Sequence, residues 1–210
     1  MTADLRQYAP ATQRNREPIL EVLQRVLPPT GTVLEVASGT GEHAVFFAPH
    51  LQPRSWLPSE FNPQLLESIK AWQKVYPCDF LYSPIRLDSQ NIPWNLDSHE
   101  AEITAIVCIN MIHISPWEVC LGLMAGAEQV LPSQGILYLY GPYKQKGEHT
   151  APSNASFDQS LRFSNPLWGV RNLEDVIEVA QAHDLHHLET IEMPANNLSV
   201  VFEKGIGNRE

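Results

Sequence analysis

The stretch VLEVASGTGEHA, residues 33–44, constrains the fold of this chain more than any other. Mostly apolar residues with one acid among them run into Gly39-Thr40-Gly41, and a helix-like segment follows. This order predicts a strand, a tight turn and the start of a helix. Glycines let such a turn adopt positive φ and let a ligand approach the backbone, while N–H groups at the helix start point outward. We therefore expect this turn to bind a ligand.

Strands and helices are predicted to alternate along the chain. Apolar residues with helical spacing cover 15–27, a helix from about 42 to 50 follows the glycine turn, and Asn62-Pro63, Ser115-Pro116 and Asn172 open three more helices. The predicted strands are 32–36, 55–60, 85–87, 103–109, 136–140, 188–192 and 198–203. The connection 193–197 is short, so the last two strands should form an antiparallel hairpin. The pattern predicts a single α/β domain over 1–210, a three-layer sandwich with a mostly parallel seven-stranded sheet.

Residues 141–171 interrupt this alternation. They are rich in Gly, Pro, Asn, Ser and aromatic residues, and they are too long for a plain connection. Insertions of this kind usually cover or line a binding site, so we expect a substrate lid. The alternative is a structured excursion whose aromatic side chains only fill space in the domain.

Charge and cysteine content exclude several classes of protein. The formal net charge of −10 argues against nucleic acid as the main partner, because phosphate binding usually requires clustered Lys and Arg. Three scattered cysteines favour a reducing compartment. The N-terminus lacks the layout of a secretory signal, and no run approaches the length of a membrane span. We expect a cytoplasmic protein with a small-molecule substrate, no membrane partner and an open oligomeric state.

Two cofactor classes fit the glycine turn. Gly39-x-Gly41-x-x-Ala44, with Glu60 about twenty residues onward to accept from a ribose, matches the loose dinucleotide pattern. Glu35, however, lies near the end of the strand, where its charge disfavours a pyrophosphate and favours a cationic methionine ammonium. Asp88 follows the third strand, where it would accept from an adenine amino group. These acids and the terminal hairpin favour S-adenosylmethionine, although a nicotinamide cofactor stays possible.

Together, E-x-x-x-G-x-G, Glu60 in SEF and Asp88 resemble the class I S-adenosylmethionine-dependent methyltransferases. The usual pattern has a glycine where this chain has Ala37, which affects the expected geometry of the turn. PATQRNREPIL, NMIHISPW, NPLWGVRNLEDV and MPANNL are similar to an uncharacterised methyltransferase-like family of about this length. The resemblance implies an enzyme that binds its cofactor with Glu35, Ala37, Gly39, Gly41, Glu60 and Asp88. From their position and chemistry, the further candidate cofactor-binding residues are Phe61, Asn110, Arg14 and Asn15.

Methyl transfer from a sulfonium needs mainly alignment, with a base where the acceptor carries a proton. The candidate catalytic residues follow the fourth and fifth strands: Asn110, His113 and Tyr143. The candidate substrate-binding residues are Tyr140, Asn154, Phe157, Asp158, Arg162, Trp168 and Arg171. Simpler roles stay open: strand capping for Asn110, core packing for His113 and the tyrosines, and helix capping or solvated charge for Arg14 and Asn15.

Three further hypotheses remain at this point. His183, His186 and His187 straddle a predicted helix end without an orienting carboxylate pattern, so no metal site is expected. The first rival function is a nicotinamide-dependent oxidoreductase. The second is a non-catalytic module that keeps the fold and the cofactor.

Overall fold

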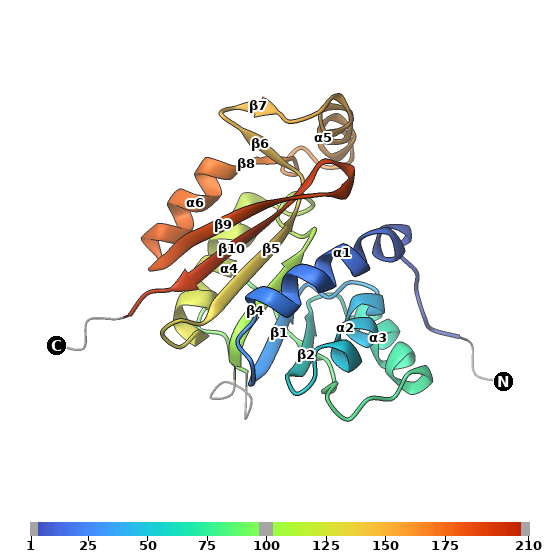
Figure 1. Ribbon diagram of the computed structural model, residues 1–210. Coiled ribbons are helices and arrows are strands. Elements are labelled where there is room, and N and C mark those ends of the chain that lie inside the picture. Colours follow the sequence, from blue (N-terminus) through green and yellow to red (C-terminus); the bar gives the residue numbers. More distant parts are fainter. Residues whose placement is uncertain (1–3, 97–102, 207–210) are drawn as a thin grey trace. The chain divides into compact units, whose positions relative to one another are not determined.

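The computed structural model describes residues 4–96 and 103–206 of the 210-residue chain. A seven-stranded sheet has the strand order β3-β2-β1-β4-β5-β10-β9 (Figure 1). Its strands are β1 (Thr32–Val36), β2 (Ser55–Glu60), β3 (Ile85–Arg86), β4 (Ile103–Ile109), β5 (Ile136–Gly141), β9 (Leu185–Met193) and β10 (Asn197–Lys204). β1, β2 and β3 pair in parallel, whereas β10 is antiparallel to both β5 and β9. The predicted α/β class, mostly parallel sheet and C-terminal hairpin are confirmed.

The chain divides into two compact units. Unit 1 comprises residues 1–88 and 95–107, and unit 2 comprises residues 89–94 and 108–210. Each unit is described by itself below, and the single domain expected from the sequence stays a prediction.

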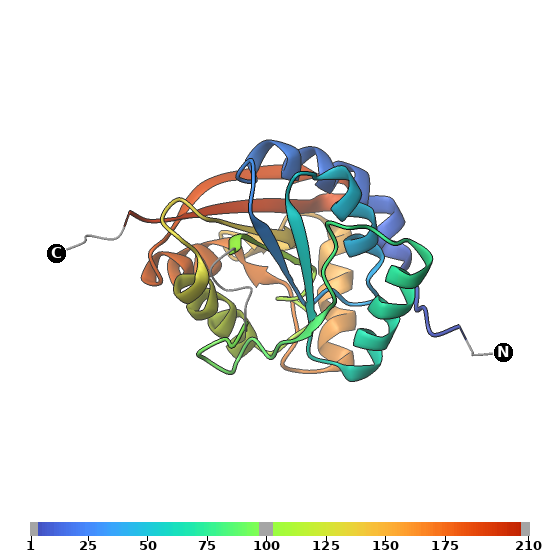
Figure 2. The same cartoon turned by 90° about the horizontal axis from the view of Figure 1, so that it is seen from below.

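Three helices belong to unit 1: α1 (Pro10–Val26), α2 (Glu42–His50) and α3 (Pro63–Val75). Figure 2 shows α2 and α3 running side by side near β2. α3 begins as predicted, because Asn62 Oδ1 accepts from the Gln64 N–H at 2.9 Å and Pro63 supplies a preset φ. The predicted start of α1 at residue 15 is wrong, since Pro10 opens the helix five residues earlier.

The core of unit 1 forms around β1, in which all five residues are buried. Phe47 of α2 packs against Trp56 of β2 with ring centroids 5.3 Å apart, and both side chains are almost fully buried. Large aromatic side chains contribute much of the apolar area that stabilises such a core. This packing fixes α2, and with it the turn that joins α2 to β1.

Unit 2 contains α4 (Trp117–Val130) and α6 (Leu173–Ala182); α6 contacts both β9 and α4. Ser115 does not cap α4 as expected. Its hydroxyl donates to the Met111 carbonyl at 2.9 Å, and Pro116 occupies the N-cap position without a side-chain hydrogen bond. The hydroxyl therefore stabilises the turn that precedes the helix.

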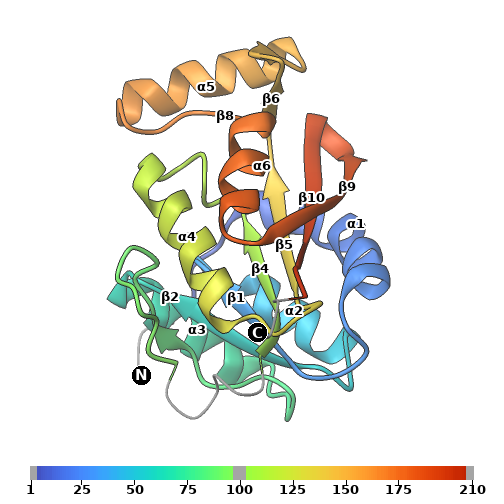
Figure 3. The same ribbon diagram turned by 90° about the vertical axis from the view of Figure 1, so that its left-hand side faces the viewer.

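Residues 141–171 form ordered secondary structure rather than an irregular loop. They contain β6 (Tyr143–Gln145), β7 (Glu148–His149) and α5 (Pro152–Ser164), and β8 (Arg171–Asn172) completes a three-stranded sheet ordered β7-β6-β8. Figure 3 shows α5 beyond the end of β5, next to β6 and β8. The structured excursion is thus the arrangement observed, and the role of this segment as a lid stays a prediction.

One smaller difference concerns the start of β9. β9 begins at Leu185, three residues before the predicted start, because its pairing with β10 continues to Lys204.

In the part of the chain that the structure describes, no helix is both long and apolar enough to cross a membrane.

Candidate functional site

The glycine turn of unit 1, residues 37–41, links the end of β1 to the start of α2. Ala37, Gly39 and Gly41 all have positive φ, at 57°, 58° and 94°. Glycine adopts this region freely, but a residue with a Cβ pays roughly 1–2 kcal/mol there. Ala37 thus adopts a glycine-like conformation at the position where the usual pattern has glycine. The backbone is therefore left-handed at residue 37 even though this chain has alanine there.

The two glycines of this turn serve different purposes. A Cβ on Gly41 would lie 2.8 Å from the Ile69 Cα, so its absence allows α3 to pack against the turn. A Cβ on Gly39 would meet no atom of the described residues within 4 Å. The backbone at Gly39 is therefore the part of the turn that another molecule can approach closely.

Glu60, the last residue of β2, is hydrogen-bonded to this turn. Its Oε2 accepts from the Gly39 N–H at 2.9 Å, and its Oε1 accepts from the Phe61 and Asn62 N–H groups at 2.9 and 3.0 Å. A carboxylate offers about four lone-pair positions, so these three bonds leave one for a further donor. The residue predicted to contact a ribose thus holds the backbone of the turn and keeps acceptor capacity.

Glu35 lies deeper than the sequence suggested. Its carboxyl is buried, and Oε2 accepts from the Trp56 indole N–H at 3.0 Å. Burial raises the pKa of Glu35 to about 7, against the opposing effect of its hydrogen bonds to Trp56 and Ser38. The carboxyl therefore faces the core of unit 1, and its predicted influence on a bound cation would act through its electrostatic field.

Glu42 is a third acid at this turn and was not among the residues predicted from the sequence. It lies in the first turn of α2, it is buried, and its Oε2 accepts from the Thr40 hydroxyl at 3.0 Å and from the Ala9 N–H. A carboxylate at a helix N-terminus is stabilised by the helix dipole. An acid directly after the second glycine was the available signal, but its partner at Ala9 is 33 residues away.

Arg14 and Asn15 both lie inside α1 rather than before it. Arg14 is exposed, whereas Asn15 is buried and its Oδ1 lies 2.9 Å from His43 Nε2. Burial, and to a smaller extent the charge of Arg16, lower the pKa of His43 to about 3. A neutral imidazole donates from Nε2 to the Asn15 carbonyl oxygen, so Asn15 joins α1 to α2. Neither residue caps the helix, whose N-cap is Ala9.

Phe61 and Asp88 lie just after β2 and β3 in unit 1. The Phe61 ring is 53% exposed, and the Arg86 guanidinium lies 5.3 Å from its centroid. Asp88 is partly buried two residues beyond β3, which pairs with β2 at Glu60 and Arg86. The predicted cofactor residues Gly39, Glu60 and Phe61 are thus gathered at the ends of neighbouring strands.

In unit 2, Asn110 and His113 follow β4 directly. Asn110 has φ of 61°, and its N–H donates to the Tyr140 carbonyl at 2.8 Å. A Cβ on Gly141 would lie 3.0 Å from His113 Nδ1 and 3.7 Å from Asn110 Oδ1. The two predicted catalytic side chains therefore converge on the end of β5.

His113 is buried and neutral. Burial, with a smaller contribution from the charge of Arg171, lowers its pKa to about 4. Its ring packs edge-on against Phe157 at 5.7 Å, and within residues 4–96 and 103–206 its Nδ1 has no hydrogen-bond partner. A buried polar atom without a partner is uncommon, because leaving it unpaired costs free energy.

Tyr140 and Tyr143 lie in the core of unit 2. Burial raises the pKa of Tyr143 well above its ordinary value, and its hydroxyl has no hydrogen-bond partner among the described residues. A neutral phenol can donate or accept a hydrogen bond but is not available as a phenolate at neutral pH. Their roles in catalysis and substrate binding stay predictions.

Asp158 connects several elements of residues 141–171. Its oxygens accept from the Val170 N–H at 2.7 Å and from Arg162 Nε at 3.1 Å, and Lys144 Nζ lies 3.5 Å away. Burial raises the pKa of Asp158, but the bonds from Val170 and Arg162 outweigh burial and lower it overall. Gly169 permits this packing, because its Cβ would lie 2.8 Å from both Asp158 Oδ1 and Arg162 Nη2. In the structure, Asp158 therefore interacts with Val170, Arg162 and Lys144 of the same segment.

The remaining candidate substrate residues divide into buried and accessible side chains. Asn154 is buried and donates to the Thr150 hydroxyl at 3.0 Å and the Asn196 carbonyl at 2.9 Å. Phe157 and Arg162 are exposed, and Trp168 is partly buried. Asn154 therefore links α5 to the connection between β9 and β10. Phe157, Arg162 and Trp168 are at least partly accessible to solvent.

The three histidines near the C-terminus have separate partners. His183 Nδ1 lies 2.6 Å from Glu128, His186 Nε2 lies 3.1 Å from Asp184, and His187 Nε2 lies 2.9 Å from the Thr190 hydroxyl. Within the described ranges, no three His, Cys, Asp or Glu side chains come together in a way that would hold a metal ion.

Several solved structures that share this fold are methyltransferases. The S-adenosylmethionine-dependent methyltransferase SibL, in its apo form, has a TM-score of 0.74 at 16% identity, over 93% of this chain and 56% of its own. An O-methyltransferase family 2 protein from Planctomyces limnophilus, in complex with apigenin, has a TM-score of 0.76 at 19% identity, over 92% of this chain and 57% of its own. The YcgJ protein from Bacillus subtilis has a TM-score of 0.69 at 12% identity, over 93% of this chain and 100% of its own.

This chain therefore spans just over half the length of the first two proteins and matches the third throughout. At these identities the likeness establishes the fold alone, which is the Rossmann-like methyltransferase fold. A family model described as a protein of unknown function, DUF938, matches residues 6–204, so the chain belongs to this family.

Proposed function

We propose that this protein is an S-adenosylmethionine-dependent methyltransferase that acts on a small molecule, and that unit 1 binds the methyl donor. The observation that carries the proposal is the bond from the Gly39 N–H to Glu60 at 2.9 Å, at a turn that a ligand can approach. The bond holds the Glu60 carboxylate, the proposed acceptor for a ribose hydroxyl, next to the accessible backbone of Gly39. Such a pairing suits an adenosyl group at the carboxyl ends of parallel strands.

The charge around the turn favours a cationic ligand. Glu42 and Glu60 are buried beside residues 37–41, and buried Glu35, with a pKa of about 7, adds part of a negative charge at neutral pH. A pyrophosphate normally uses the helix N-terminus that follows a glycine turn, but here Glu42 occupies the first turn of α2. A sulfonium with an ammonium group has the opposite charge and gains from the same field. This argument favours S-adenosylmethionine over a nicotinamide dinucleotide.

The residues of unit 1 fit the donor in specific ways. Glu60 has one acceptor position left for a ribose hydroxyl, and Asp88 is assigned to the adenine amino group. Gly39 allows close approach. Glu35, whose pKa of about 7 leaves it ionised in part of the molecules at neutral pH, contributes a partial negative charge. S-adenosylmethionine, when bound, supplies an electrophilic methyl group. The protein then has mainly to orient the acceptor.

We assign proton removal from the acceptor to His113 of unit 2. Its pKa of about 4 keeps the imidazole neutral at physiological pH, and its Nδ1 has no hydrogen-bond partner in the described parts of the chain. A neutral imidazole nitrogen can accept a proton from a hydroxyl or amine as the methyl group is transferred. A pKa this low makes His113 a weak base, so positioning is its larger contribution. Asn110 is proposed to orient the acceptor.

Calorimetric titration with S-adenosylmethionine, S-adenosylhomocysteine and NAD⁺ tests the cofactor. Both sulfur nucleosides should bind saturably, whereas NAD⁺ should not saturate. Saturable binding of NAD⁺ without binding of the two nucleosides would overturn the proposal in favour of an oxidoreductase.

Incubation with labelled methyl donor and a metabolite extract tests the reaction itself. A labelled product that His113→Gln reduces, while donor affinity stays unchanged, is the expected result. Donor binding without any labelled product would instead identify a non-catalytic module of the same fold.

A further inference from the structure

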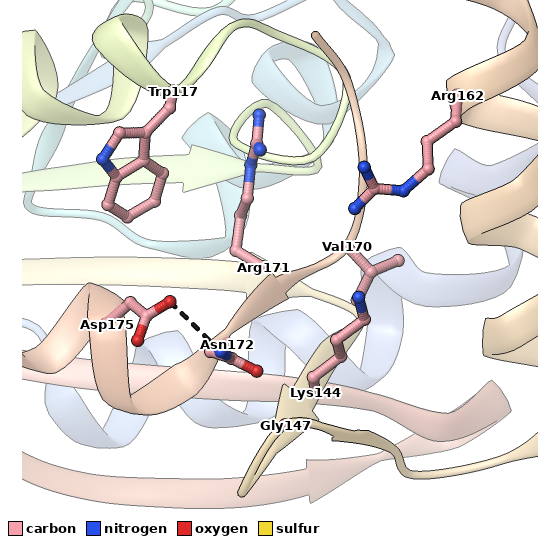
Figure 4. A pocket seen from close by; sticks show the side chains of 8 residues that line it. All are labelled: Trp117, Lys144, Gly147, Arg162, Val170, Arg171, Asn172 and Asp175. Carbon is pink, nitrogen blue, oxygen red and sulfur yellow. Dashed lines mark hydrogen bonds between the residues drawn. The ribbon is translucent and has the colours of Figure 1, made fainter. Parts of the chain in front are cut away.

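A cavity of about 360 Å³ lies within unit 2 among α4, α5, α6, β6 and β8 (Figure 4). The side chains that matter for its chemistry are Trp117, Lys144, Arg162, Arg171, Asn172 and Asp175. We call this cavity the cationic pocket. Its volume falls in the range that small-molecule sites usually have.

The cationic pocket concentrates positive charge in an acidic protein. The chain has 14 Lys and Arg residues and a net charge of −10, yet three of these cations line one cavity. Lys144 and Arg162 share one carboxylate, that of Asp158. Asp175 contributes a second negative charge at the pocket. Positive charge therefore exceeds negative charge here, which favours an anionic ligand.

Arg171 is held rigidly at the pocket by neutral groups. Its Nε donates to the Ile112 carbonyl at 3.2 Å, and Nη2 donates to the Ser115 and Leu167 carbonyls at 2.7 and 2.9 Å. Among the residues that the structure describes, no carboxylate forms an ion pair with it. In Figure 4 its side chain extends beside the Trp117 ring, whose centroid lies 5.6 Å from the guanidinium carbon. The charge of Arg171 is thus preorganised and not neutralised by a carboxylate.

Asn172 adds an acceptor that is independent of this charge. Its Nδ2 donates to Asp175 Oδ2 at 3.1 Å, which identifies the other amide atom as oxygen. Its Oδ1 is buried and has no hydrogen-bond partner in the described parts of the chain. Asn172 occupies the N-cap of α6, where such an oxygen commonly accepts from the helix, but it makes no capping bond.

The arrangement of these groups suits one end of a small molecule. Figure 4 shows the Asn172 carboxamide oxygen pointing toward the Lys144 side of the pocket. Arginine guanidinium groups bind planar oxyanions with paired hydrogen bonds, and lysine adds a point charge. A hydroxyl or amino group next to the oxyanion would satisfy Asn172 Oδ1.

We propose that the cationic pocket binds the oxyanion group of a small molecule, a carboxylate or a phosphate, with a neighbouring hydroxyl or amino group donating to Asn172. This assignment goes beyond the methyl donor proposed for unit 1 and does not depend on it. The titrations below omit the methyl donor, so their failure leaves the proposed function standing.

Titration of the ¹⁵N-labelled full chain by NMR tests the site. Inorganic phosphate, acetate and glycolate serve as probes at constant ionic strength, because salt screens weak charge interactions. We expect saturable shifts at Lys144, Arg162, Arg171 and Asn172. Lys144→Met and Arg162→Gln should each weaken binding of the preferred probe roughly tenfold, the loss expected for a charge-assisted hydrogen bond. Stronger binding of phosphate than of glycolate indicates a phosphorylated ligand, and the reverse order indicates a carboxylate.

The matched control is Lys70→Met, which removes an exposed cation of α3 in unit 1 and should change affinity less than twofold. Lys144→Met and Arg162→Gln each remove a partner of Asp158 and could unfold the protein. Asn172→Ala tests the pocket without this risk, because the Asn172 side chain does not cap α6. The wild type should prefer glycolate to acetate, and Asn172→Ala should abolish that preference. Absence of saturable shifts up to about 20 mM probe, or equal losses in Lys144→Met and Lys70→Met, would overturn the proposal.

Discussion

The carboxylate of Glu60, at the end of β2, accepts a hydrogen bond from the Gly39 N–H at 2.9 Å, across 21 positions of sequence. The same side chain accepts from two further N–H groups at the start of the loop that leads into α3. One acid thus holds two connections of unit 1 in a fixed conformation. This relationship explains why an acid at this position affects both the shape of the turn and its affinity for a ligand.

Glu60→Ala should weaken binding of S-adenosylmethionine by about 1–3 kcal/mol, because it removes an acceptor and leaves buried N–H groups unpaired. Calorimetric titration measures this loss, and Glu67→Ala on α3 is the matched control, since Glu67 is exposed and forms an ion pair with Lys70. Equal affinity in the folded Glu60→Ala variant and the wild type would contradict the assignment of Glu60.

Glu35→Gln should change the pH dependence of stability. Folding raises the pKa of Glu35 from 4.5 to about 7, so the folded state binds more protons than the unfolded state between these values. The free energy of unfolding of the wild type should therefore decrease by about 3 kcal/mol as pH rises from 4.5 to 7. Glutamine keeps an acceptor for Trp56 without the charge, so the variant should lose this decrease.

Urea denaturation at several pH values measures the effect of Glu35→Gln. Glu21→Gln, at an exposed position of α1, controls for the loss of one negative charge. Parallel pH curves for Glu35→Gln and the wild type would show that Glu35 is ionised normally in the folded protein.

Gly39→Ala and Gly41→Ala should separate binding from stability. Both place a Cβ at positive φ, which costs roughly 1–2 kcal/mol. Only the alanine at position 41 would also press on the Ile69 backbone, which adds about 1–3 kcal/mol. Gly41→Ala should therefore lower the melting temperature more, while Gly39→Ala should remain folded and lose most of its affinity for the donor. A Gly39→Ala variant with full affinity would exclude close approach of the ligand there.

His113 should remain neutral down to about pH 4, the value to which burial lowers its pKa. Below its ordinary value of 6.5 the unfolded state binds more protons, so stability present above pH 6.5 should be lost as pH falls toward 4. His113→Gln removes this dependence, and His43→Gln removes the comparable one at α2. NMR titration of the imidazole resonances provides the direct measurement, and a midpoint for His113 near 6.5 would contradict its burial.

Local sequence determined most of the secondary structure of this protein. The apolar run Ile103–Ile109 and the helix Glu42–His50 have the bounds that their patterns predict, and Asn62-Pro63 opens α3 as expected. These features depend on periodicity, capping and proline geometry, which act over a few neighbouring residues. The acids and glycines of the turn were identifiable for the same reason, since their spacing is local.

Tertiary structure alone decided how the polar side chains are used. Glu35 faces Trp56 rather than a ligand, Glu42 accepts from Ala9, and Asp158 binds Val170, because the partners of a buried group come from distant segments. Helix α5 was missed since residues 152–164 have few apolar positions to show its period. The cationic pocket likewise exists only after five elements of unit 2 assemble, because no stretch of sequence contains its charges together.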